Sequence, residues 1–581
     1  MDMVNVKVNG IAVSVPKGST ILEAARAAGV EIPTLCYLKD MNEIGACRIC
    51  MVEATGARGL VTACVYPVAE GMEIQTNTAR VQKARKTTLE LILSTHDKKC
   101  LSCVRSGDCE LQKLCKDYGV EDSGKYDGDC PKYALDTSVP HLVRDNNKCI
   151  LCRRCVAACQ QQFVSVIGAN DRGIDTHIAC AFEKPLGDVP CVSCGQCVVV
   201  CPTGALTDND STADVWAALA DPDKHVVVST APSIRATLGE CFGMPVGTNV
   251  EGKMVAALRR LGFNKVFDTN FGADLTIVEE ANEFVSRVKN NGVLPMITSC
   301  SPGWVKFAEY YYPDQLDHLS SCKSPQQMTG AVIKTYYAQK MGIDAKDIYH
   351  VSVMPCTAKK FEIGREDESA AGVPDVDAVL TTRELARMIE RAGLKFDMLP
   401  DEEFDAPLGD DTGAAVIFGA TGGVMEAALR TANDWLTGKD NEAVDFHEVR
   451  GMNGLKEATY TINGLEVKVA VASGIASANY VMNMIQSGTA PWHFVEIMCC
   501  PGGCINGGGQ PIQPASVRNF TDLKALRAKA LYDQDAGMAL RKSHESPVVK
   551  KLYEEFFDDG IGGHKAHHCL HTTYVARKKF K

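Results

Sequence analysis

Short stretches in which hydrophobic and polar residues alternate open the chain. Residues 4–8 (VNVKV) and 11–15 (IAVSV) alternate in this way, and Asn9-Gly10 between them is typical of a type I′ turn. These stretches predict a β-hairpin. The next segment, ILEAARAAG, follows Ser19-Thr20, so that it has a capping residue before it and a glycine at its end. We therefore expect a hairpin followed by a helix.

The pattern changes near residue 222, where longer apolar runs alternate with helical segments. Seven runs predict buried strands: HVVVSTAP, KVFDTN, LPMITSC, IYHVSVMPC, AVIFGAT, EVKVAVASG and FVEIMCC. Strands that alternate with helices indicate parallel sheets wrapped by helices, and sites in such sheets form beyond the carboxyl ends of strands. Cysteines stand at three of these ends: Cys300, Cys356, and the Cys499-Cys500 pair with Cys504. We expect the functional site there.

Composition narrows the class of protein. The chain has 581 residues, 45% of them hydrophobic, which is enough for several domains. A formal net charge of -11 argues against a nucleic-acid binder and favours proteins and small molecules as partners. The N-terminus shows no export signal, and no apolar run reaches the roughly 18 residues of a membrane helix. We expect a cytoplasmic protein that is not bound to a membrane.

The 26 cysteines are grouped in cluster-like spacings that indicate a reducing compartment. The run C-x2-C-x2-C-x3-C-P, and a near copy upstream, is the signature of two 4Fe-4S clusters in one folded unit, in which the fourth cysteine of each run reaches the other cluster. Structural zinc sites instead use C-x2-C pairs separated by a longer loop. The predicted ligands are Cys149, Cys152, Cys155, Cys159, Cys191, Cys194, Cys197 and Cys201.

Two further groups of metal ligands precede this pair of runs. Cys36, Cys47, Cys50 and Cys64 follow the predicted hairpin and helix, and this combination resembles the small β-grasp ferredoxin that carries a 2Fe-2S cluster. The second group follows a helix predicted at 81–94. It offers a histidine and three cysteines, which suit either a 4Fe-4S cluster or zinc, and its position between two iron-sulfur modules favours the cluster. Its members are His96, Cys100, Cys103 and Cys109.

The fold class is therefore a multidomain chain of five parts. We predict a β-grasp 2Fe-2S ferredoxin-like domain, a 4Fe-4S cluster module with one histidine and three cysteine ligands, a two-cubane 4Fe-4S ferredoxin domain, an α/β catalytic domain and a C-terminal tail. Their ranges are 1–80, 81–125, 140–210, 222–540 and 541–581.

Three segments carry a specific resemblance. They are TSCSPGW at 298–304, MPCTAKKFE at 354–362 and EIMCCPGGCINGGGQP at 496–511. Together they resemble the H-cluster signatures of the iron-only (FeFe) hydrogenases, whose usual forms are TSCCPxW, MPCxxKxxE and ExMxCxxGCxxGGGxP. The resemblance extends over essentially the whole chain, and it implies that the tail at 541–581 is similar to the separate small subunit of some family members. It is strongest to the hydrogen-activating subunit of multi-subunit NADP-reducing enzymes.

The resemblance implies an H-cluster, which is a 4Fe-4S cubane joined through one cysteine to a diiron unit with CO, CN and a dithiolate bridge. Cys356, Cys500 and Cys504 match cubane ligands, and Cys504 matches the bridging one. Lys359 would hydrogen-bond a cyanide as a charged donor. A run of glycines would let the backbone pack closely against the cofactor. The remaining matches are the apolar walls Met354 and Met498, the second cyanide-binding loop Ala231, Pro232 and Ser233, and the glycines Gly507, Gly508 and Gly509.

The first motif departs from the family pattern, because the usual pair of cysteines is replaced by Cys300 and Ser301. By position Cys300 matches the residue that relays protons. The fourth cubane ligand then has three candidates: Ser301 as an alkoxide, the extra Cys499, or Cys300 itself with Ser301 handling the proton. Thiolate is the better iron ligand.

Glu280 and Glu283 lie three residues apart in the helical stretch IVEEANEFVSR, which places them on one face. Spacing alone would make them a solvated helix face. The resemblance instead makes them, together with Ser320, the proton path that leads outward from Cys300. Seven cysteines have no ligand role and are expected to be mostly buried thiols: Cys115, Cys130, Cys180, Cys241, Cys322, Cys499 and Cys569.

The sequence as a whole predicts an iron hydrogenase that interconverts H2 with protons and electrons. Electrons would pass through the two cubanes, then through the His96 cluster and the 2Fe-2S cluster. Since no flavin or nicotinamide fingerprint is visible, NAD(P) would be reduced on partner flavoprotein and small iron-sulfur subunits, with ferredoxin as a further partner if the complex bifurcates electrons. The alternative is a non-catalytic electron-transfer subunit of the complex I type, which the first 210 residues also resemble.

Overall fold

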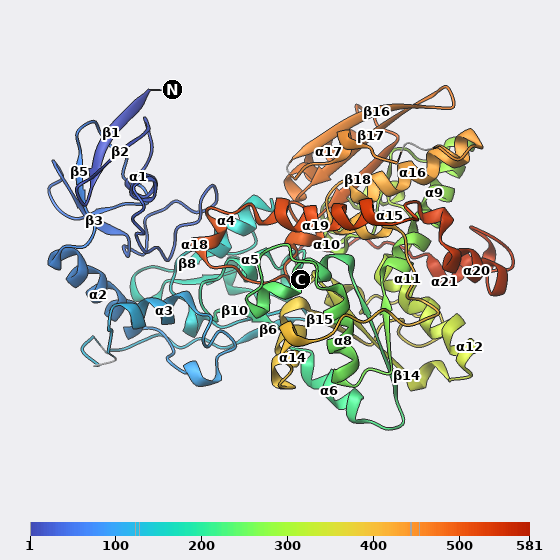
Figure 1. Ribbon diagram of the computed structural model, residues 1–581, viewed down its shortest axis with the longest axis horizontal. Helices are drawn as coiled ribbons and strands as arrows, with labels where there is room; N and C mark the ends of the chain where they lie inside the picture. Colours follow the sequence, from blue (N-terminus) through green and yellow to red (C-terminus); the bar gives the residue numbers. More distant parts are fainter. Residues whose placement is uncertain (1, 122–123, 127, 442–443, 453, 581) are drawn as a thin grey trace.

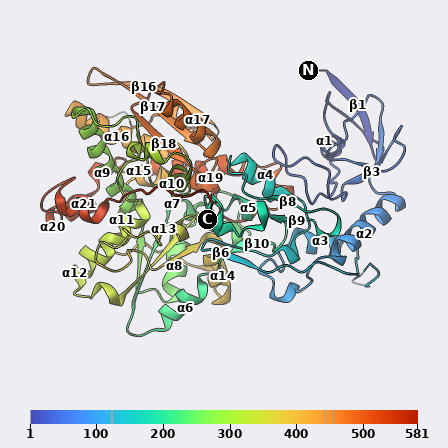
Figure 2. The same ribbon diagram turned by 180° about the vertical axis from the view of Figure 1, so that it is seen from behind.

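The computed structural model describes residues 2–121, 124–126, 128–441, 444–452 and 454–580 (Figure 1). Residues 1 and 581, which bound the first and last predicted domains, lie outside this part, as do residues 122 and 123 near the end of the second. The iron-sulfur segments occupy one end of the molecule and the two large sheets the other, and the view from behind shows the same division (Figure 2).

The N-terminal segment forms a five-stranded sheet in the order β2-β1-β5-β3-β4, with β1 and β5 parallel. The predicted hairpin is confirmed, since Asn9 and Gly10 have φ values of 49° and 85°, the left-handed pair that a type I′ turn needs. Helix α1 begins at a capping box made by Thr20 and Glu23, also as expected. The elements are β1 Met3–Val8, β2 Ile11–Pro16, α1 Ile21–Ala27, β3 Met51–Ala54, β4 Val61–Thr62 and β5 Glu73–Gln75.

The following iron-sulfur segments contain little regular structure. Two helices, α2 and α3, precede a compact unit of a three-stranded sheet, β10-β7-β6, and a two-stranded one, β8-β9. The predicted helix at 81–94 is confirmed by α2. The elements are α2 Ala79–Ser94, α3 Glu110–Asp117, β6 Asp136–Val139, β7 Leu142–Arg144, α4 Arg154–Gln161, β8 Gly168–Asn170, β9 His177–Ala179, α5 Gln196–Val199 and β10 Leu206–Asp208.

Two four-stranded sheets form the core of the remaining chain. The first, β12-β11-β14-β15, is entirely parallel, and the second has the order β13-β18-β17-β16. Buried valine, isoleucine and leucine side chains from both sheets pack under the surrounding helices. The strands are β11 His225–Thr230, β12 Lys265–Asp268, β13 Met296–Ile297, β14 Ile348–Met354, β15 Ala378–Thr381, β16 Leu455–Ile462, β17 Leu465–Ser473 and β18 Phe494–Met498.

Helices cover these sheets, and the C-terminal helices α20 and α21 pack against α9 and α11 (Figure 1). Among the described residues, none of the helices combines the length and apolar character that crossing a membrane requires. The helices are α6 Thr212–Ala220, α7 Pro232–Arg235, α8 Glu251–Leu261, α9 Asn270–Lys289, α10 Pro302–Tyr311, α11 Pro325–Val332, α12 Ala338–Met341, α13 Lys359–Glu362, α14 Thr382–Arg391, α15 Gly413–Val416, α16 Gly423–Thr437, α17 Ile475–Gln486, α18 Ala515–Arg518, α19 Leu523–Gly537, α20 Pro547–Glu555 and α21 His564–Leu570.

Two expectations about the strands were wrong. The run AVIFGAT forms helix α15 and a 3-10 turn at Ile417–Gly419, because a short buried apolar run has no periodicity that separates helix from strand. The turn at Gly419–Gly423 accordingly joins a 3-10 turn, and not a strand, to α16. The second sheet is mixed, since β16 runs antiparallel to β17 as the arm of a hairpin. Six of the seven predicted runs do contain strands.

Candidate active site

The four cysteines predicted to hold a 2Fe-2S cluster converge in the N-terminal segment. The sulfur atoms of Cys50 and Cys64 lie 3.3 Å apart, and the amide of Cys47 donates to the Cys36 sulfur at 3.5 Å. Three of the four side chains are buried, and Cys47 is partly exposed. Thiols gathered in this way under a thin cover of loop are suited to an iron-sulfur cluster near the surface.

The His96 group lies directly against the two-cluster unit. The thiol of Cys109 donates to the carbonyl of Pro202 at 3.6 Å, and a Cβ atom added to Gly204 would lie 2.6 Å from the Cys103 sulfur. His96 has a buried Nδ1 atom with no hydrogen-bond partner among the described residues, and burial lowers the pKa of its ring. A neutral imidazole is the form that binds a metal. Cys100 belongs to the short 3-10 turn of the same loop.

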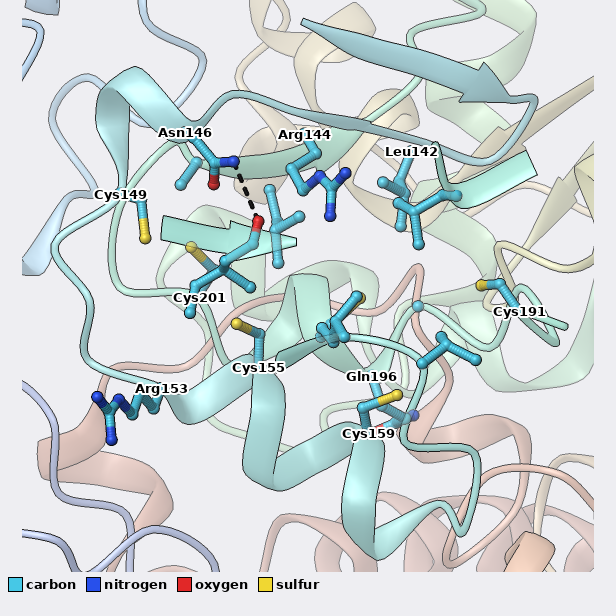
Figure 3. A pocket seen from close by; sticks show the side chains of 18 of the residues that line it. Leu142, Arg144, Asn146, Cys149, Arg153, Cys155, Cys159, Cys191, Gln196 and Cys201 are labelled. Atoms are coloured by element: carbon cyan, nitrogen blue, oxygen red, sulfur yellow. Dashed lines mark hydrogen bonds between the residues drawn. The ribbon is translucent and has the colours of Figure 1, made fainter. Parts of the chain in front are cut away.

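The eight cysteines of the two predicted cubanes line one cavity (Figure 3). They fall into two sets, because the last cysteine of each run lies with the first three of the other. Burial and neighbouring thiols raise the pKa of Cys155 and of Cys197. Deprotonating such a thiol costs free energy unless a metal ion compensates the charge of the thiolate. We name the two sets by their position relative to the second cavity described below. The proximal set is Cys159, Cys191, Cys194 and Cys197, and the distal set is Cys149, Cys152, Cys155 and Cys201.

A second cavity lies where the carboxyl ends of strands from both large sheets meet. Ala231 follows β11, Cys300 follows β13, Cys356 follows β14 and Cys500 follows β18. The predicted residues that line this cavity are Ala231, Pro232, Cys300, Ser301, Met354, Cys356, Lys359, Met498, Cys500 and Cys504. Ser233 is buried nearby, where its hydroxyl accepts a 3.4 Å hydrogen bond from Gln510.

The chemistry of this cavity fits a large iron-sulfur group with diatomic ligands. Burial raises the pKa of Cys356 and raises that of Cys504 to about 12, and iron removes this cost because it replaces the protons. Lys359 supplies a buried cation. Thr269 and Gln326 line the same cavity, and their Oγ1 and Oε1 atoms have no hydrogen-bond partner among the described residues. We did not find these two from the sequence, because neither stands in a cysteine motif.

Cys300, Ser301 and Cys499 face different neighbours. The charge of Glu280 and the thiol of Cys504 contribute to the raised pKa of Cys300, after burial itself. The hydroxyl of Ser301 accepts a hydrogen bond from the Cys499 amide at 3.2 Å. The Cys499 sulfur is in hydrogen-bonding contact with Cys194 of the proximal set and with Cys500, and it lines the cavity. Cys499 is therefore a buried thiol that contacts both cysteine groups.

The glycines at 507–509 were expected to let the backbone pack against the cofactor, but their nearest neighbours are other parts of the protein. Cβ atoms added to Gly507 and Gly508 would lie 2.2 Å from the carbonyl oxygens of Pro355 and Cys194, respectively. Glycine is needed there because this loop presses against the loops that carry two other cysteine groups, and only Gly507 of the three lines the cavity. Gly509 packs against Thr381 in the same way.

The three predicted proton-path residues form a connected group behind Cys300. Glu280 is 2% exposed, and burial raises the pKa of its carboxyl to about 8. Ser320 hydrogen-bonds Glu280 and also donates to Glu283 at 3.1 Å. Glu283 also pairs with Arg287 at 2.6 Å. The reading of these glutamates as a solvated helix face is excluded for Glu280, which is fully enclosed.

Family comparisons match the chain in five places. They are "2Fe-2S iron-sulfur cluster binding domain" at 1–79, "NADH-ubiquinone oxidoreductase-G iron-sulfur binding region" at 85–124, "4Fe-4S dicluster domain" at 148–205, "Iron only hydrogenase large subunit, C-terminal domain" at 224–508 and "Iron hydrogenase small subunit" at 521–577. The prediction of a multidomain chain with these iron-sulfur domains and a hydrogenase catalytic domain is confirmed.

Individual relatives agree with these matches. The chain is 49% identical to the NADP-reducing hydrogenase subunit HndD of Solidesulfovibrio fructosivorans, over all of both chains. It is 44% identical to iron hydrogenase 1 of Clostridium pasteurianum, over 98% of this chain and 100% of that one. A solved FeFe-hydrogenase variant from Chlamydomonas reinhardtii is 39% identical, with a TM-score of 0.57 over 64% of this chain and all of that one. The chain belongs to the FeFe (iron-only) hydrogenase family, as a catalytic subunit with an iron-sulfur electron relay.

Proposed function

We propose that this protein oxidises H2 and reduces protons at an H-cluster held in the cavity at the strand ends. The observation that carries the proposal is that Cys356, Cys500, Cys504 and Lys359, which come from two separate motifs, line one cavity. The H-cluster, when bound, supplies the iron that splits H2 and the bridging amine that exchanges protons with the protein. The residues of the chain orient this group, exclude water and carry protons and electrons away.

Lys359 places a positive charge in the wall of this cavity. Its ammonium group donates to the Glu362 carboxylate and to the carbonyl of Cys300, which fixes it at the cavity wall where a cyanide would lie. Met354 and Met498 contribute soft, apolar surface to the cavity wall. Ala231 and Pro232 also line the cavity.

Protons would move between Cys300 and Glu280, and onward through Ser320 to Glu283. The contacts among the last three support this order. Glu280 suits the work because burial raises the pKa of its carboxyl to about 8, near the operating range of a cytoplasmic enzyme. This assignment leaves Cys300 outside the ligand set of the cubane.

Cys499 would complete that ligand set. Ser301 stands where the family has a cysteine, and Cys499 lies beside it, with its amide on the Ser301 hydroxyl and its sulfur in contact with Cys500. Thiolate is a better ligand for iron-sulfur clusters than alkoxide. The loss of a thiol at 301 and the gain of one at 499 would thus compensate each other within one site.

The accessory clusters would be one 2Fe-2S and three 4Fe-4S centres, and their contacts support a forked electron route. The proximal set contacts the H-cluster loop, which is the segment 504–509 that begins at Cys504, since the backbone of Gly508 packs on Cys194 and Gly195. The distal set is in contact with both outer groups: Asn42 of the first segment donates to the Cys152 carbonyl at 3.0 Å, and Cys109 contacts Pro202. Both outer clusters would therefore exchange electrons with the distal set directly, which differs from the series order expected from the sequence.

Electrons would leave to partner subunits that bind flavin and reduce NAD(P). The relative HndD is, by name, a subunit of an NADP-reducing hydrogenase. Bifurcation with ferredoxin is part of this proposal and predicts that NADP reduction by the purified complex requires ferredoxin. The alternative, a non-catalytic electron carrier of the complex I type, has no use for the second cavity and its thiols. A cytoplasmic location remains an expectation of the same proposal.

Infrared spectroscopy tests the proposed function. The anaerobically matured protein should show bands in the CO and CN stretching region, and these should shift when H2 is added. A fully matured sample with its iron-sulfur clusters intact but no such bands would contradict the proposal and leave the electron-carrier alternative.

A further inference from the structure

The C-terminal tail brings a histidine to the outer end of the proton path. After α21 the chain runs beside residues 320–323: the amide of Lys323 donates to the Leu570 carbonyl, and that of Thr572 donates to the Ser321 carbonyl, both at 2.8 Å. These two bonds bracket His571. The tail thus lies as an extra strand-like segment against the loop that carries Ser320 and Ser321, with an isolated bridge between Cys322 and His571.

A continuous series of hydrogen bonds leads from Glu283 to this histidine. The Ser321 hydroxyl lies 3.1 Å from Glu283 Oε2 and 2.8 Å from His571 Nδ1. The other ring nitrogen, Nε2, lies 3.3 Å from Glu279. The His571 ring also stacks on that of His567, with centroids 4.4 Å apart and an interplanar angle of 8°, and His567 is exposed. The series therefore runs from a half-buried carboxylate to a histidine that stacks on an exposed one.

The opposite side of Glu283 faces Arg287. Arg287 holds Glu283 Oε1 through two donors at 2.6 Å and 3.0 Å, and it donates further to the carbonyls of Leu319 and Asp317. A guanidinium keeps its protons at any working pH, so it orients the carboxylate but cannot take up a proton from it.

From this geometry, and resting on the proposed function, we infer that Ser321 and His571 form the proton exit of this hydrogenase, with His571 as the relay between Glu283 and solvent. Outward transfer moves one proton from Glu283 to the Ser321 oxygen while the Ser321 hydroxyl proton passes to His571 Nδ1. The imidazolium then releases its Nε2 proton toward Glu279 and water. The ring and the serine hydroxyl turn afterwards, so that an unprotonated ring nitrogen again faces Ser321. Proton uptake follows the same steps in reverse.

The groups around His571 suit a relay. Glu279 and Glu283 of α9, Cys322 of the facing loop and His567 of α21 are the titratable groups that face it. Glu279 is held in place by Tyr553 of α20 and by the amide of Gly562. Imidazole is the side chain that both gains and loses a proton near neutral pH.

The same place permits a rival reading as a metal site, because ligand atoms of Glu283, Cys322 and His571 lie within 4.8 Å of one another. Hydrogen bonds already satisfy the carboxylate and the Nδ1 atom through Ser321, which favours the relay. A metal would have to displace that hydroxyl.

The test compares H571Q and S321A with H568Q in the full matured protein. His568 is an exposed neighbour in α21 that lies outside the series, so H568Q controls for changes in the tail. Rates of H2 oxidation with a viologen dye are measured from pH 6 to 9, in H2O and D2O, with and without added imidazole. Iron content, zinc content and the CO and CN bands are recorded on the same samples.

We expect H571Q and S321A each to lose on the order of tenfold or more in rate, with a larger solvent isotope effect, and imidazole to restore much of the loss in H571Q only. The double variant should be no slower than either single one. Unchanged rates, a loss that follows iron content, or stoichiometric zinc that disappears in H571Q would each overturn the proton exit. Absence of CO and CN bands in the parent protein would instead contradict the proposed function.

Discussion

The ammonium group of Lys359 lies 2.8 Å from the carboxylate of Glu362, one helical turn away, and both side chains are less than 10% exposed. Ser324 and Gln326 also donate to this carboxylate, at 2.8 Å and 2.9 Å. Glu362 is therefore fixed by three groups, and it fixes Lys359 in turn. Removing one member of a buried pair costs about 3–5 kcal/mol, because the other charge is left without its partner.

This pair predicts that K359M loses the diiron unit but keeps the accessory clusters, since the cation at the cavity wall disappears. The measurement is iron per chain together with the intensity of the CO and CN bands. K360M is the matched control, because Lys360 is also buried and pairs with Glu384 at 2.7 Å, yet it does not line the cavity. Equal loss of the bands in both variants would show that lost stability alone is responsible.

Glu280 predicts a pH dependence with a definite sign. Outward transfer needs its carboxylate form, so H2 oxidation should rise as pH increases through about 8, the pKa to which burial raises this group. Proton reduction needs the carboxylic acid and should fall over the same range. E280Q should lose on the order of a hundredfold or more of the rate in both directions, and its rates should no longer change with pH near 8, while E280D should retain part of the activity. A change of rate near pH 8 that persists in E280Q would show that another group titrates there.

The raised pKa of Glu280 also affects the free energy of unfolding. The folded carboxyl keeps its proton up to about pH 8, whereas the unfolded chain releases it near the ordinary value of 4.5. Folding stability should therefore decrease as pH rises between these two values, and this decrease should be smaller in E280Q. Thermal unfolding of the anaerobic protein from pH 5 to 9 measures the difference.

Ser301 and Cys499 predict an exchange experiment. Protein produced without the diiron unit should contain a complete complement of 4Fe-4S clusters in the parent and in S301A, but less iron in C499A. The double variant S301C/C499A should regain the iron, because it moves the thiolate to the position that is usual in the family. Mössbauer spectroscopy and iron analysis report the outcome. Loss of a cluster in S301A, with C499A unaffected, would assign the ligand to the serine.

Gly508 predicts a steric effect on electron transfer. A methyl group at this position would lie 2.2 Å from the carbonyl oxygen of Cys194, so G508A must push the H-cluster loop away from the proximal cubane site. We expect slower reduction of the accessory clusters by H2, measured by stopped-flow absorbance. G537A is the control, because nothing lies within 4 Å of an added Cβ there. Identical electron-transfer rates in both variants would contradict the prediction.

His96 predicts a change of redox potential. The substitution H96C should keep the cluster that His96 binds but lower its reduction potential, since a thiolate adds negative charge where a neutral imidazole stood. H96A should lose that cluster alone. Potentiometric titration followed by EPR measures both, with the remaining clusters as internal standards. A cluster that survives unchanged in H96A would remove His96 from the ligand set.

Local sequence signals predicted local structure well. The Asn9-Gly10 turn, the capping residue Thr20 and the spacing of the cysteine runs each depend on neighbours within a few residues, and the structure places all three as expected. The run at 413–419 failed for the same reason, because its short apolar pattern is compatible with a buried helix. Tertiary packing, which no window of sequence contains, decides such cases.

Contacts between distant segments could not be predicted from these signals. His571 approaches Ser321 across 250 residues, and the close approach of Gly508 to Cys194 depends on how two domains dock. The role of Cys499 was ambiguous for a related reason, because its neighbours Ser301 and Cys194 come from two other parts of the chain. Motif spacing identified the chemistry, and the docking of the modules determined which residues share it.

One buried arginine adds a consequence for the fate of a damaged molecule. Arg154, which precedes the cluster ligand Cys155, donates to the carbonyls of Cys36 and Tyr37 and pairs with Glu110 at 2.8 Å, beside Cys109. A single guanidinium thus ties together the loops of three different clusters. Loss of a single cluster ligand leaves this guanidinium and its contacts in place. Loss of the guanidinium itself would release contacts at all three loops at once, so that one side chain outside every ligand set sustains the shape of most of the relay.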